Sequence, residues 1–319
     1  NPAQAIGVLP QSRDLGRAWE MKVDTVAILG LGLIGGSLAR AVRESGFAGR
    51  VIGYGHREPS LRRGLQLGVI DAFTLDLDEV IEQADILVIC TPTQVAAGMM
   101  REILPRQAQS DRGAVITDVA IFKCSLRDAA VDTVGQVPPR LVLGHPIAGS
   151  ERSGVDASSA ELFVNHRVIL TPEAGNDPAA VELIRAMWAS TGAEVDTMSV
   201  TEHDAVLAAT SHLPHVLAYA LVDALASSAA SEDIFRFAAG GFRDFTRIAS
   251  SDPAMWRDIA IANKGALLAS LDDFSRHLAL LREAVQAEDA GQLHATFTRA
   301  KQARDQFATM LAERGQRKS

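Results

Sequence analysis

Apolar residues follow two different spacings along this chain, and the change falls near residue 200. Before it, short unbroken runs of Val, Ile and Leu alternate with stretches whose apolar residues have helical spacing. Strands are expected at residues 25–29, 50–53, 86–90, 114–117, 141–143, 168–170 and 194–197. Helices are expected between most of them, as at 35–44 and 77–83. This alternation predicts an α/β fold of the Rossmann type, with a doubly wound and mainly parallel sheet.

After residue 200 the pattern is that of long helices. Ser199 and Glu202 have the spacing of a capping box, in which each side chain satisfies a free N–H at a helix start. An apolar stripe follows, formed by Leu213, Leu217, Leu221 and Leu225. Further helices are expected at 233–237, 252–277 and 278–304. We therefore predict a flexible extension (1–21), a dinucleotide-binding domain (22–200) and an all-helical dimerisation and substrate domain (201–319).

Composition supports this division and excludes several classes of protein. Of the 25 glycines and 12 prolines, 20 and 10 respectively precede residue 201, as expected where short elements alternate with turns. With 319 residues, 47% of them hydrophobic, the chain can bury a sizeable core. A net charge of −8 without a cluster of Lys and Arg argues against nucleic acid as a partner. The longest apolar run, 216–222, is too short for a membrane helix, so we expect a cytoplasmic protein that does not bind membranes.

A glycine-rich motif lies between the first expected strand and helix. Gly30, Gly32 and Gly35 form a G-x-G-x-x-G turn: the first permits the tight turn, the second lets a pyrophosphate approach, and the third allows close helix packing. The phosphates would sit on the helix N-terminus, where free N–H groups favour negative charge. The expected cofactor contacts are Gly30, Gly32, Leu33, Ile34 and Gly35 at this turn, and Thr91, Pro92 and Asp118 where later strands end.

The end of the second expected strand favours NADP over NAD. An NAD site usually offers Asp or Glu there, but this strand is followed by His56 and Arg57. These two side chains, with Arg62 one helical turn on, could hold a 2′-phosphate by charge-assisted bonds. The alternative is that the arginines are solvated and Glu58 binds the ribose hydroxyls of NAD.

Two segments place polar residues in otherwise apolar surroundings. In the first, His145 directly follows an expected strand and precedes a Gly/Ser loop, so it is either a structural histidine or a catalytic one. In the second, Pro214 should kink the first long helix, with His212 and His215 on the same side of the kink. No Asp, Glu or Cys stands at ligand spacing to them, so we expect no metal site. Asp244 and Arg247, three residues apart, could pair on one helical face.

These segments together resemble the prephenate and arogenate dehydrogenases of tyrosine biosynthesis, also called cyclohexadienyl dehydrogenases. The resemblance rests on four motifs in order, from about residue 23 to 306: the glycine turn, 145–151, 211–215 and 241–253. It implies a Rossmann-type domain followed by a helical dimerisation domain, and hence a homodimer. It also implies oxidative decarboxylation, in which the ring C4 hydride passes to NAD(P)+ and the ring carboxylate leaves as CO2.

The resemblance further implies roles for individual residues. His145 matches the family's catalytic histidine, which accepts the hydroxyl proton. Arg247 matches the arginine that binds the substrate carboxylate. The remaining site residues are the substrate contacts His215, Ser150 and His212, and a network gating the arginine, Glu151 and Asp244.

One position departs from the family pattern. After the fifth strand the family usually has Asp-x-Gly-Ser-Val-Lys, and its serine bonds the catalytic histidine; here Ile121 stands at the serine's position. Ile121 would lie at the substrate without making that bond, so a water or a backbone group should orient His145 instead. The departure keeps open a related substrate such as 4-amino-4-deoxyprephenate. A non-catalytic dinucleotide-binding protein is the third alternative.

Overall fold

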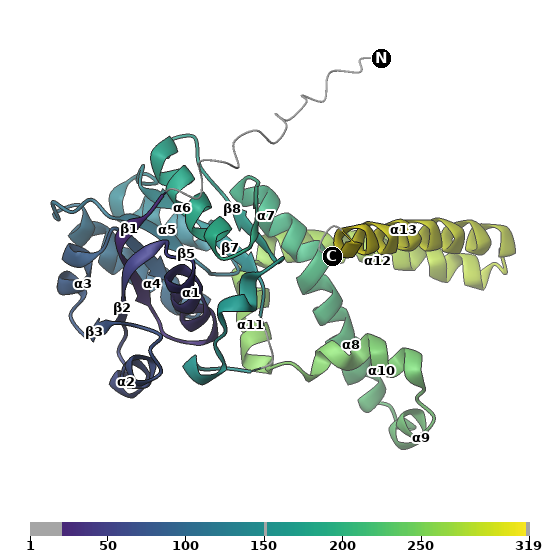
Figure 1. The fold of residues 1–319 in the computed structure, drawn as a ribbon. Helices are drawn as coiled ribbons and strands as arrows, with labels where there is room; N and C mark the ends of the chain where they lie inside the picture. The colour runs from purple at the N-terminus through teal and green to yellow at the C-terminus, as the bar shows by residue number, and fades with distance from the viewer. Residues whose placement is uncertain (1–20, 150–151, 317–319) are drawn as a thin grey trace, which may run out of the picture. The chain divides into compact units, whose positions relative to one another are not determined.

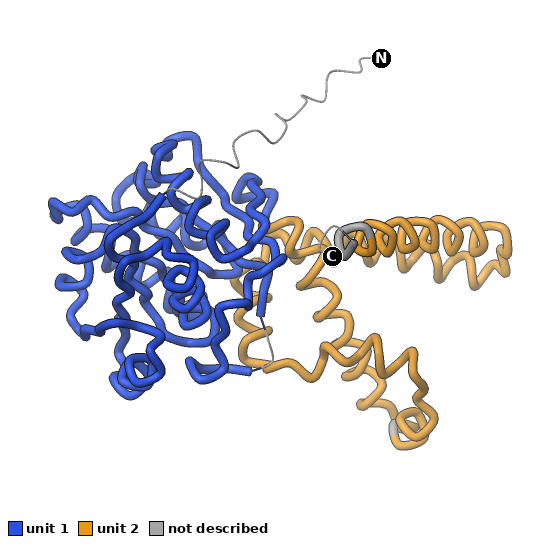
Figure 2. Tube along the Cα trace, in the orientation of Figure 1, with its two compact units in different colours: residues 1–203 blue, residues 204–319 orange. Residues whose placement is uncertain are grey.

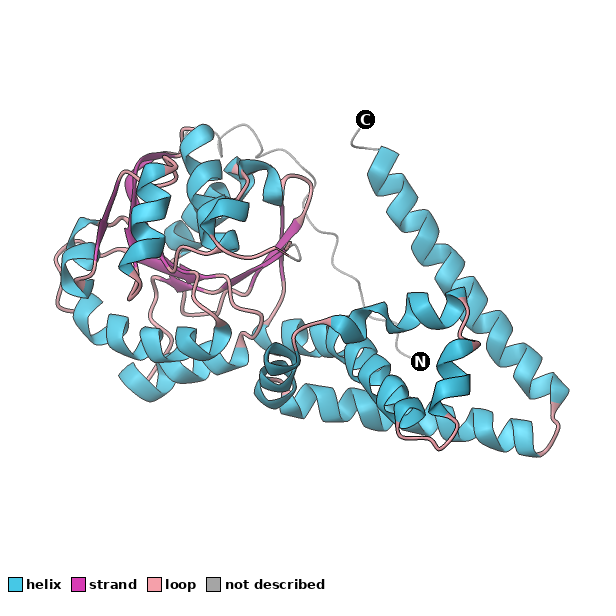
Figure 3. Cartoon of the chain, turned by 90° about the horizontal axis from the view of Figure 1, so that it is seen from below, coloured by secondary structure: helices cyan, strands magenta, loops and turns pink. Residues whose placement is uncertain are grey.

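The computed structural model describes residues 21–149 and 152–316, and the chain divides into two compact units, Asn1–His203 and Asp204–Ser319 (Figure 2). The extension expected at 1–21 lies outside the described residues except for its last one. The described strands all belong to the first unit, and in the second unit the described elements are helices (Figure 3).

The first unit is built on a six-stranded parallel sheet in the order β3-β2-β1-β4-β5-β6. Its strands are β1 (Val23–Leu29), β2 (Ala48–Tyr54), β3 (Ala72–Thr74), β4 (Ile86–Ile89), β5 (Val115–Asp118) and β6 (Leu141–Val142). Strand addition reverses between β1 and β4, and open α/β sheets bind ligands beyond the strand ends at such a point. The predicted Rossmann-type fold is confirmed.

Helices cover both faces of this sheet (Figure 1). They are α1 (Leu33–Glu44), α2 (Glu58–Gln66), α3 (Leu77–Gln83), α4 (Thr93–Gln107), α5 (Cys124–Val134) and α6 (Pro178–Ser190). Successive residues of β1 belong to different cores: Val26 and Ile28 pack with α1 and α6, whereas Ala27 and Leu29 pack with α3 and α4. Burial on both faces explains why the strands are unbroken apolar runs.

Two of the expected strands form a second sheet instead of extending the first. This sheet has the order β7-β8-β9 and consists of β7 (Gly144–Ile147), β8 (Arg167–Leu170) and β9 (Glu194–Thr197). β7 is antiparallel to β8, and β8 is parallel to β9. The sequence predicted that the strand ends at residue 143, but Gly144–Ile147 form β7. It is an edge strand, where the missing N–H of Pro146 is tolerated.

The helical run after β9 consists of α7 (Val200–Leu207), a π-helical turn η4 (Ala208–His212) and α8 (Leu213–Ala226). Ser199 accepts a hydrogen bond from the Glu202 N–H at 3.2 Å, which is one half of the expected capping box. By length and composition the run Val200–Ala226 could cross a membrane, contrary to the expectation from the longest apolar run. Its buried polar residues His203, Asp204 and His212 are hydrogen-bonded within the protein, and we read it as part of the folded chain.

The remaining elements are α9 (Ser231–Arg236), α10 (Gly240–Thr246), the 3-10 turn η5 (Arg247–Ser250), α11 (Pro253–Ala262), α12 (Lys264–Gln286) and α13 (Ala290–Gln316). The single helix expected at 252–277 is thus two helices. It breaks at Asn263, a buried residue whose amide donates to the Asp204 carbonyl at 2.8 Å. The helix expected to begin at 278 was also wrong, because α12 continues to Gln286 and the chain turns at Glu288, which has a φ of 51°.

Candidate active site

The glycine turn after β1 has the geometry that a dinucleotide site requires. Gly30 has a φ of +106°, and a Cβ there would lie 2.9 Å from the Thr91 nitrogen. A Cβ on Gly35 would lie 2.3 Å from the Gly30 carbonyl oxygen, so only glycine lets α1 pack this closely. At Gly32 nothing lies within 4 Å of an added Cβ, which leaves the backbone open to a ligand.

The residues around this turn fit a bound pyrophosphate. Gly32 precedes α1 without a side-chain cap, and Leu33 and Ile34 are the first helical residues, so the N–H groups of the first turn lack side-chain acceptors. Nearby, Pro92 precedes α4, and the buried Thr91 hydroxyl has no hydrogen-bond partner within the described part of the chain. The turn thus offers donors and a buried hydroxyl at the ends of β1 and β4.

The basic residues after β2 differ in whether they form ion pairs. His56 and Arg57 are exposed, and within residues 21–149 and 152–316 Arg57 forms no ion pair. Arg62, a candidate for binding the 2′-phosphate of NADP, donates to Glu58 at 2.9 Å. Glu58 is the candidate for binding the ribose hydroxyls of NAD, so the two candidate residues bind each other. Arg63 pairs in the same way with Asp156, which raises the pKa of Arg63.

His145 lies on β7, with 7% of its surface exposed, and its Nδ1 is 2.9 Å from Nε2 of His203. The two imidazole planes are inclined at 67°. His203 is on α7 and fully buried. A second imidazole therefore lies against Nδ1 of His145. The expectation that a water or a backbone group orients His145 stays a prediction. The sequence did not single out His203, because the run Glu-His-Asp at residues 202–204 carries no motif for a binding or catalytic site.

A buried ion pair supports the backbone just before His145. Asp118 and Lys123 have no exposed side-chain surface, and the Lys123 ammonium donates to the Asp118 carboxylate and, at 2.6 Å, to the Gly144 carbonyl. The same carboxylate accepts from the Gly144 and Ala120 N–H groups at 3.0 and 2.8 Å. Burial raises the pKa of Asp118, and Lys123 opposes this rise. Asp118, expected at the cofactor, therefore uses its carboxylate to anchor β7.

Three further residues were predicted to belong to the site. Ile121 is in the loop after β5, and Ser150 and Glu151 follow His145 in the sequence. Ile121 is half-buried between β5 and α5, and its side chain has no polar atom. Ser150 and Glu151 lie outside the described residues.

In the second unit, His212 and His215 meet the same indole, that of Trp256. His215 stacks on it with ring centroids 3.6 Å apart, and His212 meets it edge-on at 6.2 Å. The helix irregularity expected at Pro214 is the π turn that ends at His212, and π turns recur at functional sites. The two histidines therefore do lie on the same side of an irregular helix.

The electrostatic surroundings of His215 disfavour its charged form. Its Nδ1 is 2.9 Å from the Ser211 carbonyl. The pKa of His215 is lowered, chiefly because burial penalises the imidazolium; the Ser211 carbonyl opposes this shift, and the positive charge of Arg247 adds to it. The neutral form of His215 is thus favoured, and the charge of Arg247 contributes to this preference.

The expected pairing of Asp244 with Arg247 is wrong. Asp244 pairs with its neighbour Arg243 at 3.1 Å. The prediction assumed one continuous helix, but α10 ends at Thr246 and Arg247 begins a 3-10 turn. Arg247 is exposed on this turn.

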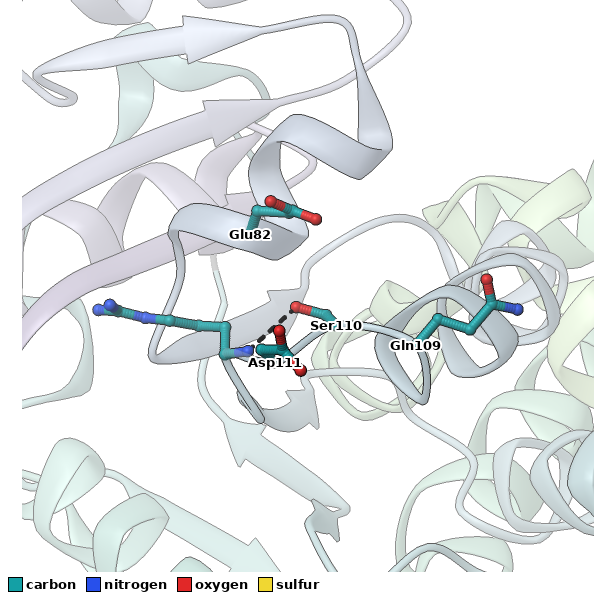
Figure 4. A pocket seen from close by; sticks show the side chains of 5 residues that line it. Glu82, Gln109, Ser110 and Asp111 are labelled. Atoms are coloured by element: carbon teal, nitrogen blue, oxygen red, sulfur yellow. Dashed lines mark hydrogen bonds between the residues drawn. The ribbon is translucent and has the colours of Figure 1, made fainter.

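Two other kinds of candidate site are a cluster of metal ligands and a hollow in the surface. No three His, Cys, Asp or Glu side chains gather as metal ligands among the residues that the structure describes. A surface hollow is lined by Glu82, Gln109, Ser110, Asp111 and Arg112 (Figure 4). These residues precede β4 and β5, so the hollow lies at the amino ends of these strands, whereas the glycine turn follows the carboxyl end of β1. Ligands of this fold bind beyond the carboxyl ends, so the hollow is not the expected ligand site.

Comparison with known proteins identifies the family. The nucleotide-binding domain of prephenate dehydrogenase matches residues 38–197, and the dimerisation domain of the same family matches residues 199–299. The prephenate dehydrogenase of Bacillus subtilis is 39% identical, over 88% of this chain and 76% of its own length. The cyclohexadienyl dehydrogenase of Zymomonas mobilis is 37% identical, over 88% and 94%.

A solved structure agrees with these matches. Prephenate dehydrogenase from Aquifex aeolicus, in complex with hydroxyphenyl propionate and NAD+, superposes with a TM-score of 0.81 at 35% identity. The superposition covers 90% of this chain and 99% of the other. The chain therefore belongs to the prephenate dehydrogenase family.

Proposed function

We propose that this chain oxidises and decarboxylates prephenate, arogenate or both in tyrosine biosynthesis, with a nicotinamide dinucleotide as hydride acceptor. The observation that carries the proposal is the nearly buried His145, held at Nδ1 by His203, in a unit whose glycine turn fits a dinucleotide. The family match spans both that unit and the helical one.

The reaction needs a proton acceptor and a carboxylate holder. When bound, the cofactor accepts the hydride from ring C4. His145 takes the proton of the C4 hydroxyl as the carbonyl forms. The carbon–carboxylate bond then breaks, CO2 leaves, and its electron pair enters the ring, so that the C4 oxygen becomes phenolic and takes a proton. Arg247 binds a substrate carboxylate, since a guanidinium is a fixed bidentate cation, and the neutral His215 contacts the substrate.

Kinetics of two variants test these roles. His145→Asn should lower kcat with little change in KM, because the base acts only in the transition state. Arg247→Ala should mainly raise KM, because it removes binding of the ground state. If His145→Asn keeps full turnover, the assignment of the base is wrong.

For the cofactor, we propose a preference for NADP+ over NAD+. No free carboxylate follows β2: Glu58 is bound by Arg62, whereas Arg57 is exposed and unpaired among the described residues. A 2′-phosphate would complete the coordination of Arg57, as a charge-assisted pair. Arg57→Ala should then lower kcat/KM for NADP+ about tenfold, a typical effect of one such pair, and leave NAD+ unaffected. Equal losses with both cofactors would contradict the preference.

The helical unit is proposed to form a homodimer. Large apolar side chains of α12 and α13 are exposed in the single chain, among them Leu278, Leu280, Val285, Phe297, Phe307 and Met310. Apolar surface of this extent marks an interaction site, and the matching family domain is a dimerisation domain. Sedimentation equilibrium should give twice the mass of one chain.

Ile121 supports testing a second substrate. In the family pattern a serine hydroxyl bonds the catalytic histidine, and Ile121 has no hydroxyl. A cyclohexadiene with an amino group at C4, 4-amino-4-deoxyprephenate, therefore belongs in the assay with prephenate and arogenate. Formation of reduced nicotinamide with each compound decides the substrate. No reduction with any of them, with either cofactor, would favour a non-catalytic dinucleotide-binding protein.

A further inference from the structure

We propose that His203 is a positioning residue, which holds His145 in the one tautomer that can accept the substrate's proton. The inference rests on the proposed role of His145 as the base. It assigns to His203 the function that the serine hydroxyl has in the family pattern and that Ile121 leaves unfilled in this chain.

A hydrogen bond with a single proton joins the two imidazoles. Nδ1 of His145 and Nε2 of His203 are 2.9 Å apart, a hydrogen-bond distance between two ring nitrogens. Between neutral imidazoles, one nitrogen must donate and the other accept. If His203 donated, His145 would carry its own proton on Nε2 and could not accept another there. If His145 donates from Nδ1, its Nε2 is a base.

A positive charge forms on His145 during the reaction. Once Nε2 of His145 has taken the substrate proton, the imidazolium donates its Nδ1–H to Nε2 of His203, and hydrogen bonds from charged donors are the stronger ones. His203 provides that acceptor where no bulk water reaches, because its side chain is fully buried. The pair therefore favours the protonated product of the transfer over the starting base.

The imidazole pair is also held rigidly. The backbone before His145 is anchored at Gly144 by the Asp118–Lys123 pair, and β7 is paired with β8 across His145 and Ile169. His203 lies in the first turn of α7, and its N–H donates to the Ser199 carbonyl at 2.9 Å. Both ends of the imidazole pair are thus fixed by regular structure, which holds the base in one orientation.

Two substitutions separate positioning from folding. His203→Phe keeps a planar ring but removes the acceptor, and His203→Gln keeps an acceptor oxygen. We expect His203→Phe to lower kcat about 10- to 100-fold, the usual effect of losing an orienting partner, with KM within about twofold. His203→Gln should recover most of the lost kcat. The matched control is His166→Phe, an exposed histidine before β8, which should keep the wild-type kcat.

A spectroscopic measurement makes the test independent of turnover. Protein with 15N-labelled histidine side chains, at mildly alkaline pH where imidazoles are neutral, reports which ring nitrogen carries the proton. The signal of His145 is assigned by its absence in His145→Asn. We expect Nδ1–H in the wild type, and a mixture of tautomers in His203→Phe.

The outcomes separate the two proposals. A wild type without dehydrogenase activity on any substrate overturns the proposed function, while the tautomer spectrum still decides the pairing. An active wild type whose His145 carries Nε2–H, or a folded His203→Phe with kcat within twofold of the wild type, overturns the role of His203. If His203→Phe does not fold, the wild-type spectrum and the kcat of His203→Gln decide the matter: a loss of 100-fold or more in the Gln variant overturns it too.

Discussion

A buried ion pair supports β7, the strand that carries His145, and replacing Lys123 by methionine tests this support. Lys123 and Asp118 have no exposed side-chain surface, and the ammonium also donates to the Gly144 carbonyl, one residue before His145. Methionine has a similar length and no charge. The substitution leaves the Asp118 carboxylate buried, with only the N–H groups of Gly144 and Ala120 as donors.

The expected loss follows from this burial. Removing one partner of a buried pair costs about 3–5 kcal/mol of unfolding free energy, because the remaining charge is uncompensated. For a unit of this size, that corresponds to a fall in Tm of roughly 10 °C. Lys123 opposes the burial-raised pKa of Asp118, so its removal raises that pKa further. A carboxyl whose pKa is raised in the folded state makes the protein less stable as pH rises, so the deficit of Lys123→Met should grow as the pH rises.

Thermal unfolding monitored by tryptophan fluorescence measures this loss. Trp188 is buried against Phe163 in the same unit and reports its unfolding. Protein concentration is held fixed, because association shifts Tm. Lys301→Met is the matched control: its pair with Asp305 is exposed on α13, and exposed pairs contribute about 0.5 kcal/mol or less.

Two results would contradict this role of the buried pair. A loss below about 1 kcal/mol at neutral pH would mean that water or a neighbouring group compensates the carboxylate. A deficit that does not change with pH would mean that Asp118 does not carry the uncompensated charge. The double variant Asp118→Asn/Lys123→Met should be more stable than Lys123→Met, because it buries no charge.

Three further predictions concern the turn, the helical unit and the departure from the family. Gly35→Ala places a methyl 2.3 Å from a backbone oxygen and should weaken dinucleotide binding at least tenfold by titration calorimetry, whereas Gly98→Ala, with open space around it, should keep the wild-type Kd. Since the pKa of His215 is lowered, the unfolded chain binds more protons, so the helical unit should lose stability as pH falls through about 6.5; His215→Gln should flatten this dependence of Tm, followed at Trp256. Ile121→Ser should change kcat by less than about threefold if the catalytic histidine is already positioned; a tenfold gain would show that the missing hydroxyl limits the enzyme.

Local patterns predicted much of the fold. The strands buried on both faces are unbroken apolar runs, and the helix α3 has the predicted bounds, because its sequence begins with Asp76 as a side-chain cap. The glycine turn was also readable, since only glycine tolerates a positive φ at residue 30 and the close approach at residue 35. These features depend on a few neighbouring residues.

Other predictions failed where distant residues decide the outcome. Asn263 ends α11 because its amide meets the Asp204 carbonyl, a residue 59 positions away. Strand β7 forms at Pro146 because β8 pairs with it from one side only. Arg247 does not meet Asp244, because the helix that would have aligned them ends one residue earlier.

The sequence by itself determined the alternation of strands and helices and the glycine turn, and it singled out His145 as the proposed proton acceptor. The tertiary structure decided how that acceptor is held. His145 on β7 and His203 on α7 are 58 residues apart in the sequence. Gly144 is bonded by Asp118, the last residue of β5, and by Lys123 in the loop after that strand. Spacing along the chain reports which side chains share a face of one element, but hydrogen bonds between elements depend on packing that brings distant segments together.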